Sequence, residues 1–252
     1  MKLSGTIKYR SRLLSQQKRC IFTFPVLHKQ IPNNLKGRSK SSQEWLSRQL
    51  TDPYIEKAKM ANYRCRSAFK LLEIDDKYHL LSAGQTVVDC GAAPGSWTQV
   101  LVERTNSAGS CRGSPVGKVI GIDRLPIYPI AGAILLGNTD FTLPCSQVKL
   151  KEHIGEQGVN VVLSDMAPNA SGVRSLDQEN IIHLAYTAFR FSVQVLSKGG
   201  SFLVKVWDGG EVPTLEKDLA KFYSKVRSIK PPASRVNSAE KFILARGFKG
   251  LK

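Results

Sequence analysis

Hydrophobic and polar positions follow two alternating spacings from about residue 41 onward. Short runs of β-branched and apolar residues, typical of strands, are separated by stretches in which apolar residues recur at helical spacing. The expected strands are 86–90, 118–123, 133–136, 159–164, 201–206, 226–229 and 241–245, and the expected helices are 66–78, 97–104, 177–197 and 212–223. This order predicts a doubly wound, Rossmann-like α/β fold, in which a mostly parallel seven-stranded sheet has helices on both faces.

The same pattern sets the expected limits of the domain. Ser41 and Glu44 stand at the capping-box spacing that begins a helix. We therefore expect one domain over residues 41–252, with residues 1–40 outside it. Lys198 and Gly199 are expected to end the helix 177–197, and the Gly- and Ser-rich stretch 106–117 predicts a surface loop.

The composition is that of a globular protein. The chain has 252 residues, of which 42% are hydrophobic and 23% are charged, and this length suits one domain and a tail. The longest stretch without a charged side chain, residues 125–139, contains two prolines and is too short to cross a membrane as a helix. We therefore expect no membrane insertion, and a protein that acts as a monomer.

The basic residues have two separate explanations. Lys and Arg total 37 against 20 Asp and Glu, a net charge of +17, and ten of the cations but no acid fall within residues 1–43. This acid-free, Ser-rich segment is typical of a mitochondrial transit peptide, which predicts location in the mitochondrial matrix; a disordered basic arm that binds nucleic acid is the alternative. The excess that remains in the domain favours a polyanionic partner.

The cysteines and histidines do not have the spacing of a metal site. None of the five cysteines is in a C-x-x-C pair, and the four histidines show no metal or triad spacing. We expect no metal, and reduced thiols at Cys20, Cys65, Cys90, Cys111 and Cys145. Trp45 and Trp207 are expected to pack in the core or at its edge.

The strongest local signal is the segment 87–97, VVDCGAAPGSW, which leads from a strand through small residues into a helix. In an open α/β sheet this turn lies at the carboxyl edge, where nucleotides bind. Its G-x-x-x-G spacing differs from the dinucleotide fingerprint, so a nicotinamide dehydrogenase is a remote alternative. Asp123, Asp140 and Asp165 follow three further strands and should meet at the same edge, with Asp123 suited to ribose hydroxyls and Asp140 to the amine of an adenine. A structural turn and helix caps are the alternative interpretation.

Over about residues 42–248, the chain resembles the FtsJ/RrmJ-type ribose 2′-O-methyltransferases, and among them the mitochondrial large-subunit rRNA methyltransferases. The resemblance is carried by this turn and by segments 63–72, 121–123, 164–169, 202–205 and 234–240. The resemblance implies the Rossmann-like methyltransferase fold, with S-adenosyl-L-methionine along Pro94, Gly95, Ser96 and Trp97, Asp123 at its ribose, Asp140 near its adenine and Asp165 closest to the methyl donor. The family often has glycine at the position of Ser96. The implied catalytic residues are Lys70, Asp165, Lys205 and Glu240.

Physical chemistry supports a base at Lys205. A ribose hydroxyl is a poor nucleophile, so its proton must be withdrawn as it attacks. A lysine has a reference pKa of about 10.4, but burial and a second cation both disfavour the ammonium form. Lys205 lies in an apolar strand, and Lys70 would supply the second charge and steer the target ribose or phosphate. Asp165 and Glu240 would hold the two ammonium groups, and as anions they act against the effect of burial.

RNA binding has separate support. Residues 57–70 contain the cations Lys57, Lys59, Arg64, Arg66 and Lys70, the rings Tyr63 and Phe69, and no acid. Cations bind phosphates and rings stack on bases, although a solvated helix face would also explain the charges. A second basic group comprises Lys221, Lys225, Arg227 and Lys230.

The resemblance and the charge together predict ribose 2′-O-methylation of mitochondrial large-subunit ribosomal RNA, within an assembling large subunit, in support of ribosome biogenesis. Uridine as the target is implied by the resemblance alone. Two alternatives stay open: a non-catalytic RNA-binding assembly factor, and a 2′-O-methyltransferase that acts on transfer RNA or on messenger RNA caps.

Overall fold

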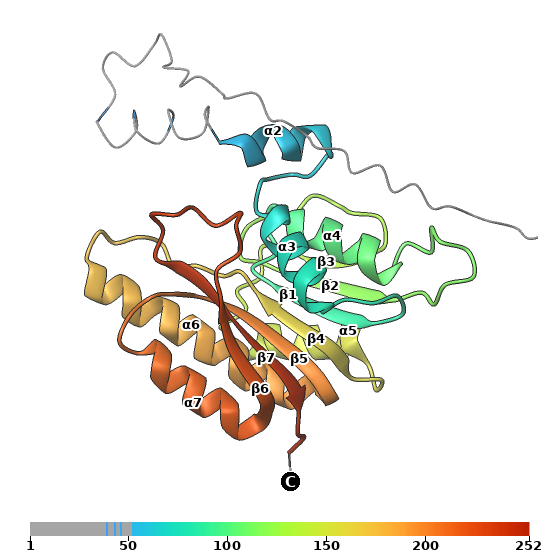
Figure 1. Cartoon of the computed structure of the whole chain (residues 1–252). Coiled ribbons are helices and arrows are strands. Elements are labelled where there is room, and N and C mark those ends of the chain that lie inside the picture. Colours follow the sequence, from blue (N-terminus) through green and yellow to red (C-terminus); the bar gives the residue numbers. More distant parts are fainter. Residues whose placement is uncertain (1–38, 40–42, 44–45, 47–51, 252) are drawn as a thin grey trace, which may run out of the picture. The chain divides into compact units, whose positions relative to one another are not determined.

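The computed structural model describes residues 39, 43, 46 and 52–251, and residues 52–251 belong to one compact unit. The helix expected to begin at Ser41, the packing of Trp45 and the thiol of Cys20 lie outside the described residues. The helices are α2 (Pro53–Met60), α3 (Ala68–Tyr78), α4 (Ser96–Thr105), α5 (Pro144–Ile154), α6 (Arg174–Val195) and α7 (Val212–Phe222). The strands are β1 (Thr86–Cys90), β2 (Lys118–Ile122), β3 (Ala133–Leu136), β4 (Val159–Ser164), β5 (Leu196–Trp207), β6 (Tyr223–Ile229) and β7 (Glu240–Phe248) (Figure 1).

All seven expected strands join one sheet. Their order is β3-β2-β1-β4-β5-β7-β6, and β1 to β5 are parallel to their neighbours. Only β7 runs antiparallel, and it lies between β5 and β6. The predicted α/β fold with a mostly parallel sheet is therefore confirmed.

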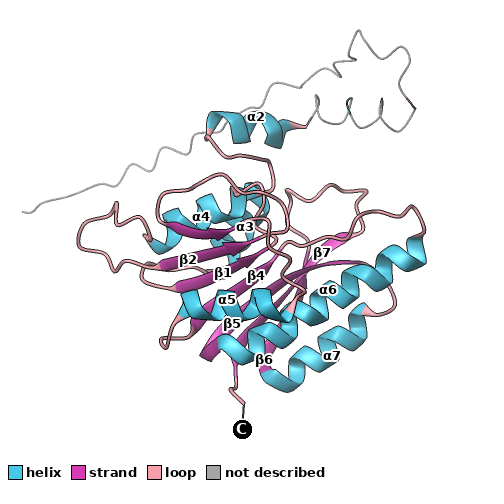
Figure 2. Cartoon of the chain, turned by 180° about the vertical axis from the view of Figure 1, so that it is seen from behind, coloured by secondary structure: helices cyan, strands magenta, loops and turns pink. Residues whose placement is uncertain are grey.

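Helices cover both faces because side chains alternate along buried strands. On β1, Val87 belongs to the apolar cluster beneath α3 and α4, whereas Val88 belongs to the cluster beneath α5, α6 and α7. The latter three helices lie in front of the sheet in Figure 2, and α3 and α4 are in front in Figure 1. Trp207 packs against the cluster beneath α5, α6 and α7, as expected.

The pattern missed two helices and placed the junction between α6 and β5 too late. The helices α2 and α5 bury few apolar side chains, Ala58 in α2 and Leu150 and Ile154 in α5, but each has proline in its first turn. Asp52 caps α2 by accepting a hydrogen bond from Tyr54 N (3.1 Å). Lys198 and Gly199 lie in β5 instead of ending α6. The chain passes directly from helix to strand because the buried Leu196 already pairs with Val159 of β4.

The reversed strand β7 determines which residues reach the functional edge. Parallel strands place their carboxyl ends together, and an antiparallel neighbour places its first residue at that same edge. Glu240, the first residue of β7, pairs with Trp207, the last residue of β5. A residue late in the chain therefore joins the ends of β1, β2, β4 and β5.

Candidate active site

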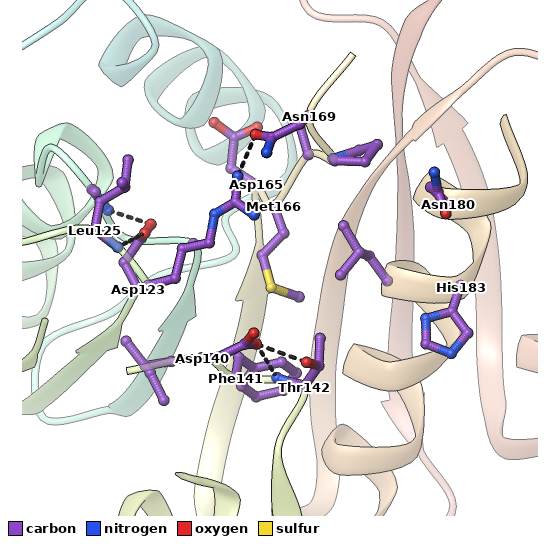
Figure 3. Close-up of a pocket in the computed structure, with 17 residues that line it drawn as sticks. Asp123, Leu125, Asp140, Phe141, Thr142, Asp165, Met166, Asn169, Asn180 and His183 are labelled. Atoms are coloured by element: carbon purple, nitrogen blue, oxygen red, sulfur yellow. Dashed lines mark hydrogen bonds between the residues drawn. The ribbon is translucent and has the colours of Figure 1, made fainter. Parts of the chain in front are cut away.

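A cleft of about 460 Å³ opens at the carboxyl ends of β1, β2 and β4. Asp123 and Asp140 lie on one side of the cleft, and Asn180 and His183 of α6 lie on the other (Figure 3). Phe141 and Met166 also line it. Apolar walls with a few converging polar groups at this edge of an α/β sheet are typical of a nucleotide site. The two α6 residues were not predicted, because they resemble the solvent-exposed side of a helix.

Asp123 and Asp140 are held in place by backbone groups. Asp123 accepts hydrogen bonds from Ala93 N (2.9 Å) and Leu125 N (2.8 Å), which join the loop after β1 to the loop after β2. Asp140 accepts from the Oγ1 (2.7 Å) and the N (2.8 Å) of Thr142, and these hydrogen bonds lower the pKa of its carboxyl. Asp140 is therefore an ionised acceptor at neutral pH.

Glycine is required at two positions of the loop between β1 and α4. Gly91 has φ 84°, and a Cβ atom there would lie 2.8 Å from Cγ of Met166. Gly95 has φ 111°, and its Cβ would lie 2.6 Å from Nη1 of Arg64. A side chain at either position would combine an unfavourable φ with a clash.

Residues 94–97 anchor this loop instead of lining the cleft. Ser96 and Trp97 are 2% exposed. The Oγ of Ser96 lies 2.8 Å from the Oγ of Ser67, and Trp97 Nε1 donates to Ser67 O (2.9 Å). Gly91 and Ala93 are the loop residues that line the cleft. The Ser96 and Trp97 side chains, which were expected beside the cofactor, thus contact the residue before α3, the helix that carries Lys70.

Arg64 closes the other side of the loop. Its Nη1 donates to Pro94 O and Tyr128 O, both at 2.8 Å, and its Nη2 donates to Pro129 O at 2.9 Å. Its backbone N donates to Oε1 of Gln99 (2.8 Å). The guanidinium therefore holds two loops that flank the cleft, and sequence reasoning, which placed Arg64 on RNA, missed this role.

Asp89, near the end of β1, is a fully buried carboxyl group. Its Oδ2 accepts a hydrogen bond from Oγ1 of Thr98 (2.8 Å), and its Oδ1 has no hydrogen-bond partner among the described residues. Burial raises the pKa of Asp89 to about 7; the Thr98 hydrogen bond lowers it, and the charges of Asp165 and Asp123 raise it further. This carboxyl is therefore largely protonated below neutral pH.

Lys205 and Asp165 form a mostly buried ion pair at the ends of β5 and β4. Lys205 is 8% exposed, as expected from its apolar neighbours, and its Nζ lies 3.0 Å from Oδ1 of Asp165. The same ammonium donates to the backbone O of Asp165. Because Asp165 also lines the cleft, it connects the cleft to the buried lysine.

Lys70 and Glu240 form the second pair. The Nζ of Lys70 lies 2.7 Å from each carboxylate oxygen, and the two side chains are 13% and 14% exposed. Ser234 Oγ donates to Glu240 Oε1 (2.8 Å). Burial raises the pKa of Glu240, but the charge and hydrogen bond of Lys70, the Ser234 hydrogen bond and the charge of Lys205 outweigh it, so the pKa is lowered.

The two ion pairs are neighbours on one face of the sheet. Lys205 pairs in register with Phe242 and Trp207 with Glu240, so Lys205 and Glu240 are diagonal neighbours, at about 7–8 Å in such sheets. The ring of Phe242 lies below Lys70, with its centroid 5.9 Å from Nζ. The structure thus brings the expected four residues together from α3, β5, β7 and the end of β4, and Asp165 is the one among them that lines the cleft.

Most cations of the basic segment 57–70 are engaged within the protein. Arg66 pairs with Asp52 (2.9 Å) and donates to Ala233 O, and Lys70 pairs with Glu240. Tyr63 donates to Glu103 Oε2 (3.1 Å). The segment therefore builds the site more than it presents free charge.

The second basic group is also divided. Lys221 pairs with Asp218 on α7 (2.7 Å), and Lys230 donates to Val236 O and Ser238 O. Lys225 and Arg227 lie on the other face of the sheet from α7 and are exposed. The four residues do not form one surface.

The described residues hold neither a metal-binding cluster nor a membrane-spanning helix. No group of three or more His, Cys, Asp or Glu side chains there could hold a metal ion, and Cys65, Cys90, Cys111 and Cys145 are free thiols. No helix in that part of the chain is long and apolar enough to cross a membrane.

Comparisons with known proteins agree with this geometry. A family model described as FtsJ-like methyltransferase matches residues 63–248. Mitochondrial rRNA methyltransferase 2 of Drosophila melanogaster is 59% identical over 222 residues, 88% of this chain and 89% of that protein. Ribosomal RNA large subunit methyltransferase E of Cereibacter sphaeroides is 46% identical over 215 residues, 85% of this chain and 87% of that protein. The crystal structure of a ribosomal RNA methyltransferase from Plasmodium falciparum matches with TM-score 0.66 and 30% identity, over 75% of this chain and all of that one.

Proposed function

The chain belongs to the FtsJ-like methyltransferase family, and from this membership we propose that it methylates the ribose 2′-hydroxyl of a uridine in mitochondrial large-subunit ribosomal RNA, with S-adenosyl-L-methionine as methyl donor. The observation that carries the proposal is the convergence of Lys70, Asp165, Lys205 and Glu240 beside a nucleotide-sized cleft. The names of the relatives support rRNA as the substrate, and that of the Drosophila relative supports the mitochondrion as the location. We further propose that the protein acts in the mitochondrial matrix.

The residues of the cleft fit the proposed cofactor. A nucleoside needs acceptors for ribose hydroxyls and an adenine amine, and Asp123 and Asp140 provide carboxylates there. Phe141 offers an apolar ring, and Gly91 lets the backbone come close to a ligand. S-adenosyl-L-methionine would supply an activated methyl group on a positively charged sulfur, and the carboxylate of Asp165 lies at the same cleft.

Lys205 is assigned the role of base. Its ammonium is mostly buried and is paired with Asp165, so it must first release a proton. The free amine would then accept the proton of the ribose hydroxyl as the hydroxyl oxygen attacks the methyl group. No free alkoxide would have to form.

Lys70 and Glu240 are assigned the placement of the target. Lys70 is held by two groups, the carboxylate of Glu240 and the ring of Phe242. A cation held this rigidly can orient a phosphate or ribose of the RNA without losing much side-chain entropy. The alternative function, a non-catalytic assembly factor, would bind RNA without needing two buried ion pairs at the cleft.

The test is methyl transfer from labelled S-adenosyl-L-methionine by the purified full chain. Substrates are mitochondrial large-subunit RNA, immature large subunits and, as a rival, transfer RNA; the modified linkage is mapped by its resistance to alkali. Lys205→Met is compared with Lys241→Met, a lysine on the same sheet that pairs with Asp208 at the surface (2.7 Å). Cofactor affinity, measured by calorimetry, shows that each variant is folded.

We expect the wild type and Lys241→Met to methylate one ribose of the large-subunit RNA. Lys205→Met should bind the cofactor normally but transfer no methyl group. Transfer by Lys205→Met at the wild-type rate would overturn the base assignment. Absence of transfer by the wild type to any of the substrates, with RNA still bound, would favour the assembly factor. Methylation of transfer RNA alone would show that transfer RNA, and not ribosomal RNA, is the substrate.

A further inference from the structure

A cationic surface lies on the outer strands, away from the cleft. It consists of Lys77 at the end of α3, Lys225 and Arg227 of β6, and Arg246 of β7, and all four are exposed. We call these four residues the outer-strand surface. None of them forms an ion pair with any residue in 52–251.

The sheet register places these side chains on one face. Arg227 lies opposite Leu244, which belongs to the apolar cluster beneath α3 and α4. Lys225 lies two residues from Arg227, directly opposite Arg246, so both share that face. Arg246 reaches the end of α3, where its Nη1 donates to Tyr78 O (2.8 Å).

The surface lies far from the catalytic residues along the strands. On β7, Arg246 is six residues after Glu240, and along β5 it pairs with Ser201, four residues before Lys205. The cations of this surface therefore cannot contact a nucleotide bound in the cleft. Lys77 is two helical turns from Lys70 on the same stripe of α3, so the surface and the catalytic edge lie along one side of the molecule.

Direct opposition of two cations is unfavourable in an isolated sheet. Like charges at opposed positions repel, and Lys225 and Arg246 stand at such positions with no acid paired to either. Arg246 is turned toward a backbone carbonyl, and Lys225 and Arg227 extend from the edge strand of the sheet. A row of phosphates would neutralise this repulsion, because a nucleic-acid backbone repeats negative charge along its length.

We infer that the outer-strand surface binds the phosphate backbone of a second segment of the substrate RNA, at a distance from the methylated nucleotide. This inference rests on the proposed function for the identity of the RNA. The contact carries no base specificity, and it raises the affinity for long, structured RNA over that for the few nucleotides that the cleft can hold.

Lysines on an edge strand have another physical explanation, since they also hinder edge-to-edge association of sheets. The two explanations differ in what they predict. Protection of the edge concerns aggregation and is independent of RNA, whereas phosphate binding changes RNA affinity and its dependence on salt.

The experiment compares two double variants of the full chain that remove the same charge. Lys225→Gln with Arg227→Gln alters the outer-strand surface, and Lys217→Gln with Lys221→Gln alters exposed cations of α7 on the other face. Binding to a mitochondrial large-subunit rRNA transcript is measured at several salt concentrations. Methyl transfer to the same RNA, at saturating RNA, is measured in parallel.

We expect the outer-strand variant to bind the transcript about tenfold more weakly and to lower the slope of log affinity against log salt by about 1.4–1.8, the value for two lost phosphate contacts. The α7 variant should keep the wild-type slope, and both should keep the wild-type transfer rate at saturation. Equal losses in the two variants, or unchanged binding with aggregation of the outer-strand variant, would overturn the inference. Absence of methyl transfer by the wild type would instead refute the proposed function. The comparison of RNA affinities would still show whether the outer-strand surface binds RNA.

Discussion

Asp89 should make the stability of the domain fall as pH rises from about 4 to 7. Its carboxyl has an ordinary pKa of 3.8 and a pKa of about 7 when buried in the folded domain. Between these values the folded state holds a proton that the unfolded state has lost, so the free energy of unfolding decreases with rising pH. A shift of about three pKa units corresponds to about 4 kcal/mol, of which about 3 kcal/mol falls between pH 5 and pH 8.

The perturbation is Asp89→Asn, which removes the titration and keeps an oxygen to accept from Thr98. The new amide NH₂ would stand where Oδ1 has no partner, which destabilises the variant by about 1–3 kcal/mol at every pH. This constant penalty cancels when one protein is compared with itself at two pH values. We expect the free energy of unfolding to fall by about 3 kcal/mol more in the wild type than in the variant between pH 5 and pH 8.

Urea denaturation followed by tryptophan fluorescence, without added cofactor, measures this difference. The control is Thr98→Val, which removes the hydrogen bond that lowers the pKa of Asp89 and should extend the wild-type pH dependence to higher pH. Glu240 does not interfere, because its lowered pKa affects stability only as pH falls below about 4.5. Parallel pH profiles for the wild type and Asp89→Asn would refute the argument from burial.

Three further substitutions test the contacts around the cleft. Lys70→Met leaves Glu240 buried without its cation and should lower the free energy of unfolding by about 3–5 kcal/mol in thermal or urea denaturation; adding Glu240→Leu should recover part of this, and no recovery would contradict the ion-pair account. Arg64→Lys loses the forked contact with three carbonyls and should weaken cofactor binding about tenfold, or about 1.4 kcal/mol, in calorimetry, with unchanged RNA affinity. Gly95→Ala should cost about 1–3 kcal/mol of stability because of its φ of 111° and clashes with Arg64 and with Cδ1 of Ile130 (2.8 Å). Combining it with Arg64→Ala should relieve only the Arg64 clash, and a neutral Gly95→Ala would show that the loop can rearrange.

The strands and the buried lysine could be predicted because their causes are local. Buried parallel strands are apolar on both faces, so the run around Lys205 indicated both a strand and a buried cation, and the structure confirms both. The helices α2 and α5 could not be predicted from periodicity, since they bury only one and two apolar side chains and their proline starts are the main signal.

The contacts between residues of the site were harder to predict than which residues belong to it. Arg64 is separated by 64 and 65 residues from Tyr128 and Pro129, the carbonyls that it holds, and nothing in the local sequence distinguishes it from an RNA-binding arginine. Asn180 and His183 reach the cleft only because α6 crosses the sheet beside it. Such roles depend on how distant segments approach each other after the sheet has formed.

The reversed direction of β7 has a consequence for the order in which the site can be completed as the domain folds. Glu240 follows Lys70 and the strands β1 to β5 in the chain, so it appears after them whenever the chain emerges amino end first, from a ribosome or across a membrane. Glu240 can pair with Lys70 only when β7 has emerged and inserted between β5 and β6. A chain in which only the first five strands have folded therefore lacks one of the four proposed catalytic groups, and the proposed site is complete only when the last strand is in place.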